Sequence, residues 1–322
     1  MIQPSLALIP TGYKDGKLYS VLPESGAGDF DVVRGSGATR INKEGLIESV
    51  ADNTPRLDYT GGGCPSLLLE PLSTNLIVNS ELNNVENISV SAVAYTISFY
   101  GTGSITLSGA HTATLSGTGA NDRVTLTFTP SAGTLICTDS GSVDNKQVET
   151  LPYATSYIPT SGQIATRLAD SVTGAGDATT FNSTEGVLYA EIAALADDGT
   201  IRRLAISDGS NNNRVFIGYD TPSKSIIFAI QSLGALEVYQ SFNISDTTQF
   251  SKIAIKYKEN DCSFWIDGVK VGTGTAALMP TGLSSLRFTQ GDTTRPLYGK
   301  VKSVITFNTA LTDAELECLT TI

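Results

Sequence analysis

The chain has 322 residues, of which 40% are hydrophobic and only 16% are charged, and its net charge is −11 at pH 7. This length is sufficient for two or three domains that each bury a core of their own. Because contact with phosphates requires a clustered basic face, an acidic chain of this kind is not expected to bind nucleic acid. No run of about 18 apolar residues is present, so no membrane span is predicted. The start at Met1 lacks the basic and then apolar pattern of a secretory signal.

The cysteines and the single histidine do not indicate a metal site, a disulfide framework or a catalytic nucleophile. Cys64, Cys137, Cys262 and Cys318 are scattered without C-x-x-C spacing, which favours free buried thiols over a zinc site or a disulfide framework. A contact between Cys262 and Cys318 is the one pairing to check. His111 has no partner for a Ser/His/Asp or Cys/His arrangement, so nucleophilic catalysis of that kind is nearly excluded.

Residues 1–80 contain short apolar segments separated by turn formers. A small hairpin is predicted to close at Asp15-Gly16, and three consecutive glycines at 61–63 indicate a loop. Turn signals recur so often that this region cannot build a deep core. It is therefore expected to lean on a partner chain or on the next domain.

Several separated blocks of this region resemble a known segment. They are Arg34, Ala38-Thr39-Arg40, Gly45, Pro55-Arg56-Leu57-Asp58, Leu68-Leu69-Glu70, Thr74-Asn75-Leu76 and Ser80. Their order resembles a connector that is widespread in tailed-bacteriophage virion proteins, where it precedes the receptor-facing parts. The resemblance implies a structural protein of the virion and implies no reaction.

Residues 81–167 are predicted to form a separate, small antiparallel β-sandwich, because short alternating strands are divided by Gly-Thr-Gly and Pro. Tyr95, Ile97 and Phe99 share one face of one such strand. The block 147–160, followed by Thr166-Arg167, resembles the closing strand of carbohydrate-binding-module-like sandwiches in the same phage proteins.

Residues 168–322 are predicted to form a third, β-rich unit. In Lys252–Lys258 the pattern places Ile253, Ile255 and Tyr257 inward and the three lysines toward water. An Asp-Gly pair at 267–268 then predicts a two-residue hairpin turn.

That turn sets the pairing of the hairpin Phe264–Gly272. Ile266 is expected opposite Val269, and Phe264 opposite Val271, with all four side chains on the core side. Trp265 and Lys270 are expected to pair on the outer side.

The hairpin and the stretch Gly299–Leu316 together resemble the laminin-G-like or concanavalin-A-like jelly roll. Thr312 and Glu315 form a capping box that predicts a short terminal helix with Leu316 and Leu319 on its apolar side. The resulting fold class is all-β: a small N-terminal strand-and-loop attachment region (1–80) followed by two antiparallel β-sandwiches (81–167 and 168–322), the second a concanavalin-like jelly roll.

Two places are candidates for ligand binding. Trp265, beside Lys270, would offer an aromatic face to a sugar ring, although packing beneath a loop or a neighbouring domain is the alternative. The loop 208–213 presents oxygen atoms from Asp208, Asn211, Asn212 and Asn213 that suit sugar hydroxyls or a hard cation. The same residue types are also typical of a tight turn, so a structural calcium ion is not asserted and no cofactor is expected.

No pair of carboxylates has the spacing of a glycosidase strand. Glu191 and Glu237 are isolated, and no phosphate-binding glycine loop occurs. The sequence therefore favours a protein without enzymatic activity.

Together these features predict a projecting fibre, spike or head-fibre component on the surface of a phage particle. It would bind other virion proteins through residues 1–80 and glycans of the bacterial surface or of mucus through its lectin-like sandwiches. A homo-oligomer is expected, with a trimer favoured. The alternatives are a capsid-decorating or tail-accessory protein that binds no sugar and, more weakly, the binding module of a polysaccharide-processing system.

Overall fold

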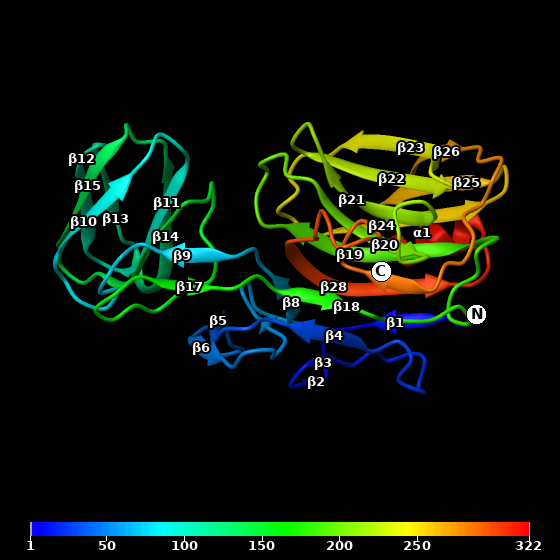
Figure 1. The fold of residues 1–322 in the computed structure, drawn as a ribbon, viewed down its shortest axis with the longest axis horizontal. Helices are drawn as coiled ribbons and strands as arrows, with labels where there is room; N and C mark the ends of the chain where they lie inside the picture. Colours follow the sequence, from blue (N-terminus) through cyan, green and yellow to red (C-terminus); the bar gives the residue numbers. More distant parts are fainter. Residues whose placement is uncertain (1, 322) are drawn as a thin grey trace.

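The structure is a computed structural model that describes residues 2–321. Strands account for 49% of the chain and helix for 3%, which confirms the all-β class. Two sandwiches lie side by side and are joined by a narrow ribbon of two strands (Figure 1). Within the described residues, no helix has the length and apolar character needed to cross a membrane.

The larger sandwich is built from two sheets that enclose the main core. Its eight-stranded sheet has the order β26 (Val269–Gly274), β25 (Cys262–Ile266), β24 (Ser251–Lys258), β19 (Glu185–Ala194), β28 (Gly299–Phe307), β8 (Ser66–Leu69) and β7 (Leu57–Asp58), with β1 (Leu6–Leu8) also paired to β28. Its five-stranded sheet has the order β23 (Ala235–Asn243), β22 (Ser225–Ser232), β21 (Arg214–Asp220), β20 (Arg202–Ser207) and β27 (Ser285–Arg287).

The N-terminal region is part of this larger sandwich. Leu6, Leu8, Leu67 and Leu69 are buried in the same core as the strands of residues 187–304. β1 and β8 complete the sheet beside β28, so apolar side chains of the N-terminal region are buried by the same chain's jelly roll. The expectation that residues 1–80 lean on another unit is met within one chain.

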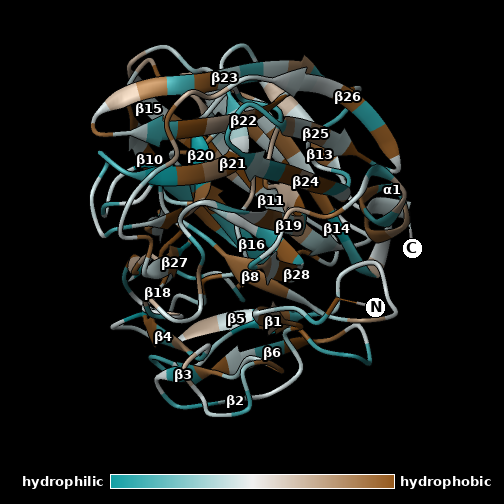
Figure 2. Cartoon of the chain, turned by 90° about the vertical axis from the view of Figure 1, so that its right-hand side faces the viewer, coloured by the Kyte–Doolittle hydropathy of each residue, from teal (hydrophilic) through white to brown (hydrophobic). Residues whose placement is uncertain are grey.

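Two smaller sheets extend this region away from the core. One has the order β18 (Ser171–Thr173), β4 (Phe30–Val33), β3 (Lys17–Leu18) and β2 (Tyr13–Lys14), and the other is the hairpin of β5 (Ala38–Ile41) and β6 (Ile47–Val50). The β2–β3 hairpin closes at Asp15-Gly16 as predicted. These sheets lie at the opposite end of the molecule from β23 (Figures 1 and 2).

The smaller sandwich is an insertion rather than the second of three consecutive units. The chain enters it on β9 (Ser73–Asn75) and returns on β17 (Ala165–Arg167), and these two strands pair with each other. We call residues 76–164 the inserted sandwich, and residues 2–72 with 168–321 the body. The predicted division into 1–80, 81–167 and 168–322 therefore differs from the observed pairing, because the first and third parts share one sheet.

The inserted sandwich has two sheets around a core of its own. They are β10 (Val85–Val90), β15 (Gly133–Ser140), β12 (Ser104–Gly109) and β13 (Ala113–Ser116), and opposite them β14 (Gly119–Phe128), β11 (Tyr95–Gly101) and β16 (Asp144–Glu149). Tyr95, Ile97 and Phe99 all point into this core, as their alternation predicts.

The hairpin of β25 and β26 differs from the expected register. Ile266 pairs with Val269 and Trp265 with Lys270, but a shift after Trp265 pairs Phe264 with Gly272 instead of Val271. Val269 is 60% exposed, so it does not face the core as predicted. On β24, Lys256 is buried and its Nζ lies 2.7 Å from Asp261 Oδ1, so only two of the three lysines face water.

The terminal helix α1 (Asp313–Thr321) forms as its capping box predicts. The Thr312 N–H donates to Glu315 Oε2 at 2.8 Å, and the Glu315 N–H donates to Thr312 Oγ1 at 3.4 Å. Leu316 and Leu319 pack against the outer face of the eight-stranded sheet. All four cysteines are free, and Cys64 and Cys318 are exposed rather than buried.

Candidate functional site

Trp265 is buried beneath helix α1. Its exposed fraction is 4%, it packs with Leu311 and Leu316, and its Nε1–H donates to Ser263 Oγ at 3.1 Å. Lys270 bridges from the hairpin to Asp313 Oδ2 at 2.9 Å. The structure therefore favours the packing alternative over a sugar platform, with helix α1 rather than a loop or a neighbouring domain covering the ring.

The loop 208–213 is held together by its own side chains. Asp208 Oδ1 accepts from the Ser210 N–H at 2.8 Å, and Oδ2 accepts from Asn213 Nδ2 at 2.9 Å. Asn213 Oδ1 in turn accepts from two backbone N–H groups, and Asn211 Oδ1 accepts from Arg214 at 2.6 Å. Asn212 is exposed.

The hydrogen bonds within this loop affect the pKa of Asp208. Burial would raise that pKa, but the bonds from Ser210 and Asn213 outweigh burial and lower it. The acceptor oxygens of Asp208, Asn211 and Asn213 are thus used to shape a turn. Across residues 2–321, no group of three or more His, Cys, Asp or Glu side chains is placed to hold a metal ion.

A large cleft lies where the inserted sandwich meets the body. Its volume is about 980 Å³, at the upper end of the roughly 300–1,000 Å³ of small-molecule sites. The body contributes the β5–β6 hairpin, the loop 58–64, residues 248–250, and Lys300 and Lys302 on β28. The inserted sandwich contributes Tyr100, residues 121–123 and residues 154–157.

Local backbone geometry shapes two parts of the cleft wall that the body contributes. Gly61, Gly62 and Gly63 all have positive φ, at 89°, 76° and 76°, which residues with a Cβ rarely adopt. On β28, the register against β19 shifts between Glu191 and Ile192, so Lys302 occupies a bulge. Its Nζ lies 4.2 Å from the Phe250 ring centroid.

Polar side chains that line the cleft are fixed by neighbours. Asp58 accepts from the backbone N–H groups of Ile41 and Thr60, and Lys300 Nζ lies 3.5 Å from its Oδ2. Arg123 donates to the Thr155 carbonyl oxygen and, at 2.8 Å, to Ser98 Oγ. The cleft therefore has preformed polar walls.

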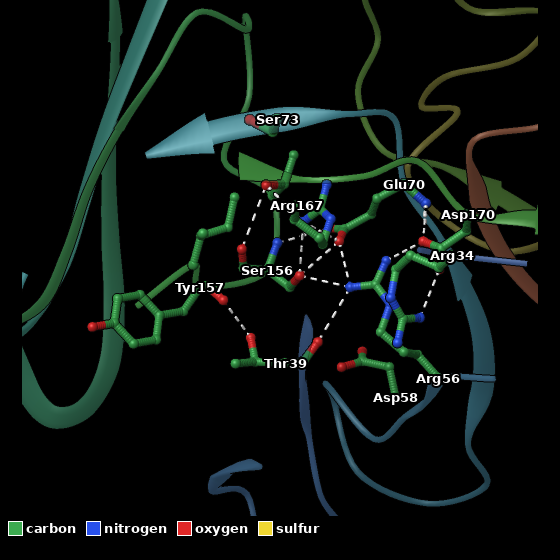
Figure 3. A network of polar contacts seen from close by, with 12 residues as sticks. Arg34, Thr39, Arg56, Asp58, Glu70, Ser73, Ser156, Tyr157, Arg167 and Asp170 are labelled. Atoms are coloured by element: carbon green, nitrogen blue, oxygen red, sulfur yellow. Dashed lines mark hydrogen bonds and ion pairs between the residues drawn. The ribbon is translucent and has the colours of Figure 1, made fainter. Parts of the chain in front are cut away.

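A buried ion cluster surrounds Glu70, which lines the cleft (Figure 3). Arg56 lies 2.6 Å from Glu70 and also pairs with Asp170, Arg167 lies 2.8 Å from Glu70, and Arg34 lies 3.0 Å from Asp170. The five side chains are at most 3% exposed. We call these five residues the buried ion cluster.

Glu70 of this cluster and the cleft residue Thr39 both contact the inserted sandwich. Ser156 donates its backbone N–H to Glu70 Oε1 and its hydroxyl to Oε2, each at 2.7 Å. Thr39 Oγ1 donates to the Tyr157 carbonyl oxygen at 2.6 Å. These bonds join the inserted sandwich to the body at the cleft.

Glu70 is the acidic centre of the cluster. Burial alone would raise its pKa, but the Arg167 and Arg56 guanidinium groups and the hydrogen bonds from Ser156 outweigh burial and lower the pKa to about 2. Glu70 therefore remains ionised at any pH at which the protein is expected to work.

The cleft residues were not among the predicted site residues. Thr39, Arg40 and Asp58 lie in blocks that resemble the phage connector, and Ser156 lies in the block that resembles a sandwich-closing strand. Those blocks carried a signal, but nothing in the sequence places them beside Lys300 and Lys302, which are more than 140 positions later.

Residues 175–317 match the family model described as the concanavalin A-like lectin/glucanases superfamily. The fold of this part of the chain is concanavalin-like. The matched segment contains most of the larger sandwich but not β1, β7 or β8, which the N-terminal region supplies. No curated protein matches the chain.

Solved structures with partial similarity include a leech intramolecular trans-sialidase with 2,7-anhydro-Neu5Ac, at 16% identity and TM-score 0.36, covering 44% of this chain and 24% of that enzyme. The CBM40 of a Ruminococcus gnavus IT-sialidase bound to α2,3-sialyllactose has 14% identity and TM-score 0.37, covering 47% and 94%. Domain 4 of a Geobacillus stearothermophilus GH43 arabinanase with arabinotriose has 14% identity and TM-score 0.36, covering 52% and 81%. The chain thus spans about a quarter of the leech enzyme.

Proposed function

We propose that this protein is a carbohydrate-binding structural protein on the surface of a tailed-bacteriophage particle. The observation that carries the binding role is the cleft of about 980 Å³, which combines fixed polar groups with the half-buried rings of Tyr59 and Phe250. Apolar sugar faces pack on aromatic rings while hydroxyl groups need fixed hydrogen-bonding partners. The match of residues 175–317 to a lectin-containing superfamily supports the same role.

The test is a glycan array probed with the full chain and with Phe250→Ala. We expect the parent protein to bind glycan and the Phe250→Ala variant to bind it with at least tenfold lower affinity. Val269→Ala, at a 60% exposed position outside the cleft, is the matched control and should bind as the parent does. A folded parent protein that binds no glycan would contradict the proposal.

The virion role rests on the two blocks of resemblance in residues 34–80 and 147–167. Arg34, Arg56, Glu70 and Arg167 from these blocks meet in one buried cluster, so the resemblance concerns residues that act together. Labelling the protein on intact particles and imaging the label tests this role, and the same preparation tests attachment through residues 1–80. Trimeric assembly is the habit of the resembled proteins, and light scattering of the full chain tests it.

We propose further that the protein acts without catalysis. A glycosidase needs one carboxyl group whose pKa is raised so that it can donate a proton. In the cleft, Glu70 has a lowered pKa and is buried between two arginines. Release of reducing sugar from any glycan bound on the array would overturn this proposal.

A second candidate is a capsid-decorating or tail-accessory protein that binds no sugar. It is favoured by one observation: Trp265 and most of the loop 208–213 are engaged inside the protein. Absence of glycan binding, together with loss of particle stability when the protein is omitted, would support this candidate over the first.

A further inference from the structure

The cleft has a charge balance opposite to that of the chain. The whole protein contains 21 basic and 32 acidic residues, but five basic and only three acidic residues line the cleft. The basic ones are Arg40, Lys43, Arg123, Lys300 and Lys302. Because like charges elsewhere on the surface repel an anionic ligand, this local excess of basic residues makes the cleft a concave place where such a ligand would be attracted.

The acidic residues of the cleft are largely neutralised. Glu70 lies in the buried ion cluster between two arginines, and Asp58 is 4% exposed and lies near Lys300. Asp122 is the one exposed carboxylate among the three. Little negative charge is thus directed into the open part of the cleft. Two of the cations are also paired from outside the lining, since Glu48 lies 2.8 Å from Arg40 and Glu191 lies 3.4 Å from Lys302.

Two cations of the cleft have no carboxylate oxygen within hydrogen-bonding distance. The Arg123 guanidinium donates only to a carbonyl oxygen and a hydroxyl group, and its buried Nε has no partner. Lys43 is 74% exposed and its nearest carboxylate, Glu44, is 3.8 Å away. A guanidinium fixed by neutral acceptors keeps its charge for a ligand, and its fork suits a carboxylate or a phosphate.

We infer that the cleft selects acidic oligosaccharides, with Arg123 and Lys43 as the ligand-pairing cations. This inference rests on the proposed carbohydrate binding and adds the class of sugar. Lys302 lies over Phe250, which offers an apolar surface to a sugar ring, but its charge is shared with Glu191 at 3.4 Å. A cleft of about 980 Å³ suits several sugar units better than one.

The experiment measures binding of the full chain by calorimetry to three probes. They are tetragalacturonate, its carboxyl-reduced tetragalactose counterpart, and an oligo(glycerol phosphate) of similar length. We expect at least one acidic probe to bind tenfold or more tightly than the neutral one. We also expect this preference to shrink between 50 mM and 500 mM salt, because salt screens exposed charges.

Substitutions test which residues cause the tighter binding of the acidic probes. Arg123→Gln is expected to lower acidic-probe affinity about tenfold, which corresponds to about 1.4 kcal/mol. Lys43→Gln, at an exposed site where folding is not at risk, is expected to lower it about threefold. Lys258→Gln is the matched control, since Lys258 lies outside the cleft and pairs with Glu185 at 2.9 Å.

The outcomes separate this inference from the proposed function. Tighter binding of tetragalacturonate than of the phosphate chain assigns the site to uronic acids, and the reverse assigns it to phosphate-bearing polymers. Equal or better binding of the neutral chain overturns the acidic preference and leaves carbohydrate binding standing. If the folded protein, with an unchanged melting temperature, binds none of the probes, the acidic preference and the proposed carbohydrate binding are both contradicted. If Arg123→Gln and Lys43→Gln bind the acidic probe as the parent does, the cleft is not its binding site.

Discussion

Glu70 is held as a carboxylate inside the protein by the guanidinium groups of Arg56 and Arg167. Removing one partner of a buried ion pair lowers the free energy of unfolding strongly, because the other charge is left buried without a partner or water. The side chain therefore matters for stability, and its contribution depends on pH.

The pKa of Glu70 falls from an ordinary 4.5 to about 2 in the folded protein. Its contribution to stability is therefore complete above about pH 4.5 and is lost as the pH falls from there toward 2. The lost contribution is on the order of 3 kcal/mol, because each pKa unit corresponds to about 1.4 kcal/mol. Urea unfolding measured from pH 7 to pH 3 tests this expectation.

The matched variants for that measurement are Glu70→Gln and Glu24→Gln. Glu24 is an exposed carboxylate, so its replacement should leave the pH profile of stability unchanged. Glu70→Gln should be less stable than the parent at pH 7 and should show a flatter loss of stability toward pH 3. A parallel profile for the parent and Glu70→Gln would contradict the assignment.

Replacing Trp265 with Ala is expected to lower the free energy of unfolding by about 3–5 kcal/mol, the usual cost of deleting a buried Trp. Its ring fills the space between β25 and helix α1 and is 4% exposed. Lys270→Ala, the neighbouring substitution on the surface, should cost less than about 1 kcal/mol. Chemical unfolding of both variants checks this, and a Trp265→Ala protein as stable as the parent would mean that the helix does not cover the ring.

At the scale of elements, the β25–β26 hairpin shows which features the local sequence pattern can predict and which it cannot. The Asp267-Gly268 turn and the two pairs next to it were predicted from residue types alone. The shift that places Phe264 opposite Gly272 was not, because a bulge depends on how β26 meets its surroundings. Gly272 has Phe242 of β23 close by, and that contact lies 30 positions away in the sequence.

The N-terminal strands show a second limit of the same kind. Short apolar segments such as Leu6–Leu8 and Leu67–Leu69 are visible in the sequence, and their need for an external partner was predicted. Their actual partner, β28, is at least 230 positions away. Because local pattern carries no information about such pairing, the body could not be recognised as one unit.

These pairings lead to a prediction about fragments. Residues 175–317 expressed alone should be aggregated or unfolded, because β28 would present an unpaired edge where β1 and β8 belong. Adding residues 1–72 as a separate chain should rescue solubility by restoring those strands. Size-exclusion chromatography and far-ultraviolet circular dichroism check this. A soluble, cooperatively folding fragment 175–317 would contradict the assigned role of β1 and β8.

At the scale of the whole molecule, the resemblance in two distant blocks of the sequence has one physical explanation. Arg56 and Glu70 come from the first block, and Ser156 and Arg167 from the second, and they meet where the inserted sandwich joins the body. The sequence predicted neither the insertion nor this meeting point. It did supply the residues, because a buried charge network demands particular side chains where a surface loop does not.

We call the contacts of Thr39 and Glu70 with the inserted sandwich the joint. Because these contacts hold the inserted sandwich against the body, the joint should control the shape of the cleft. The double substitution Thr39→Val with Ser156→Ala removes two hydroxyl groups that bond across the joint and leaves every charge in place. We expect each sandwich to stay folded while the angle between them becomes variable, so that the pair-distance distribution from small-angle X-ray scattering broadens. Glycan affinity should fall as well, since the two walls of the cleft come from different sandwiches.

Thr74→Val is the control for this prediction. It removes a matching hydroxyl group on the exposed β9–β17 ribbon, away from the joint, and should change neither measurement. If the double variant instead scatters as the parent does but loses affinity, Thr39 and Ser156 contact the ligand themselves and the joint is rigid without them.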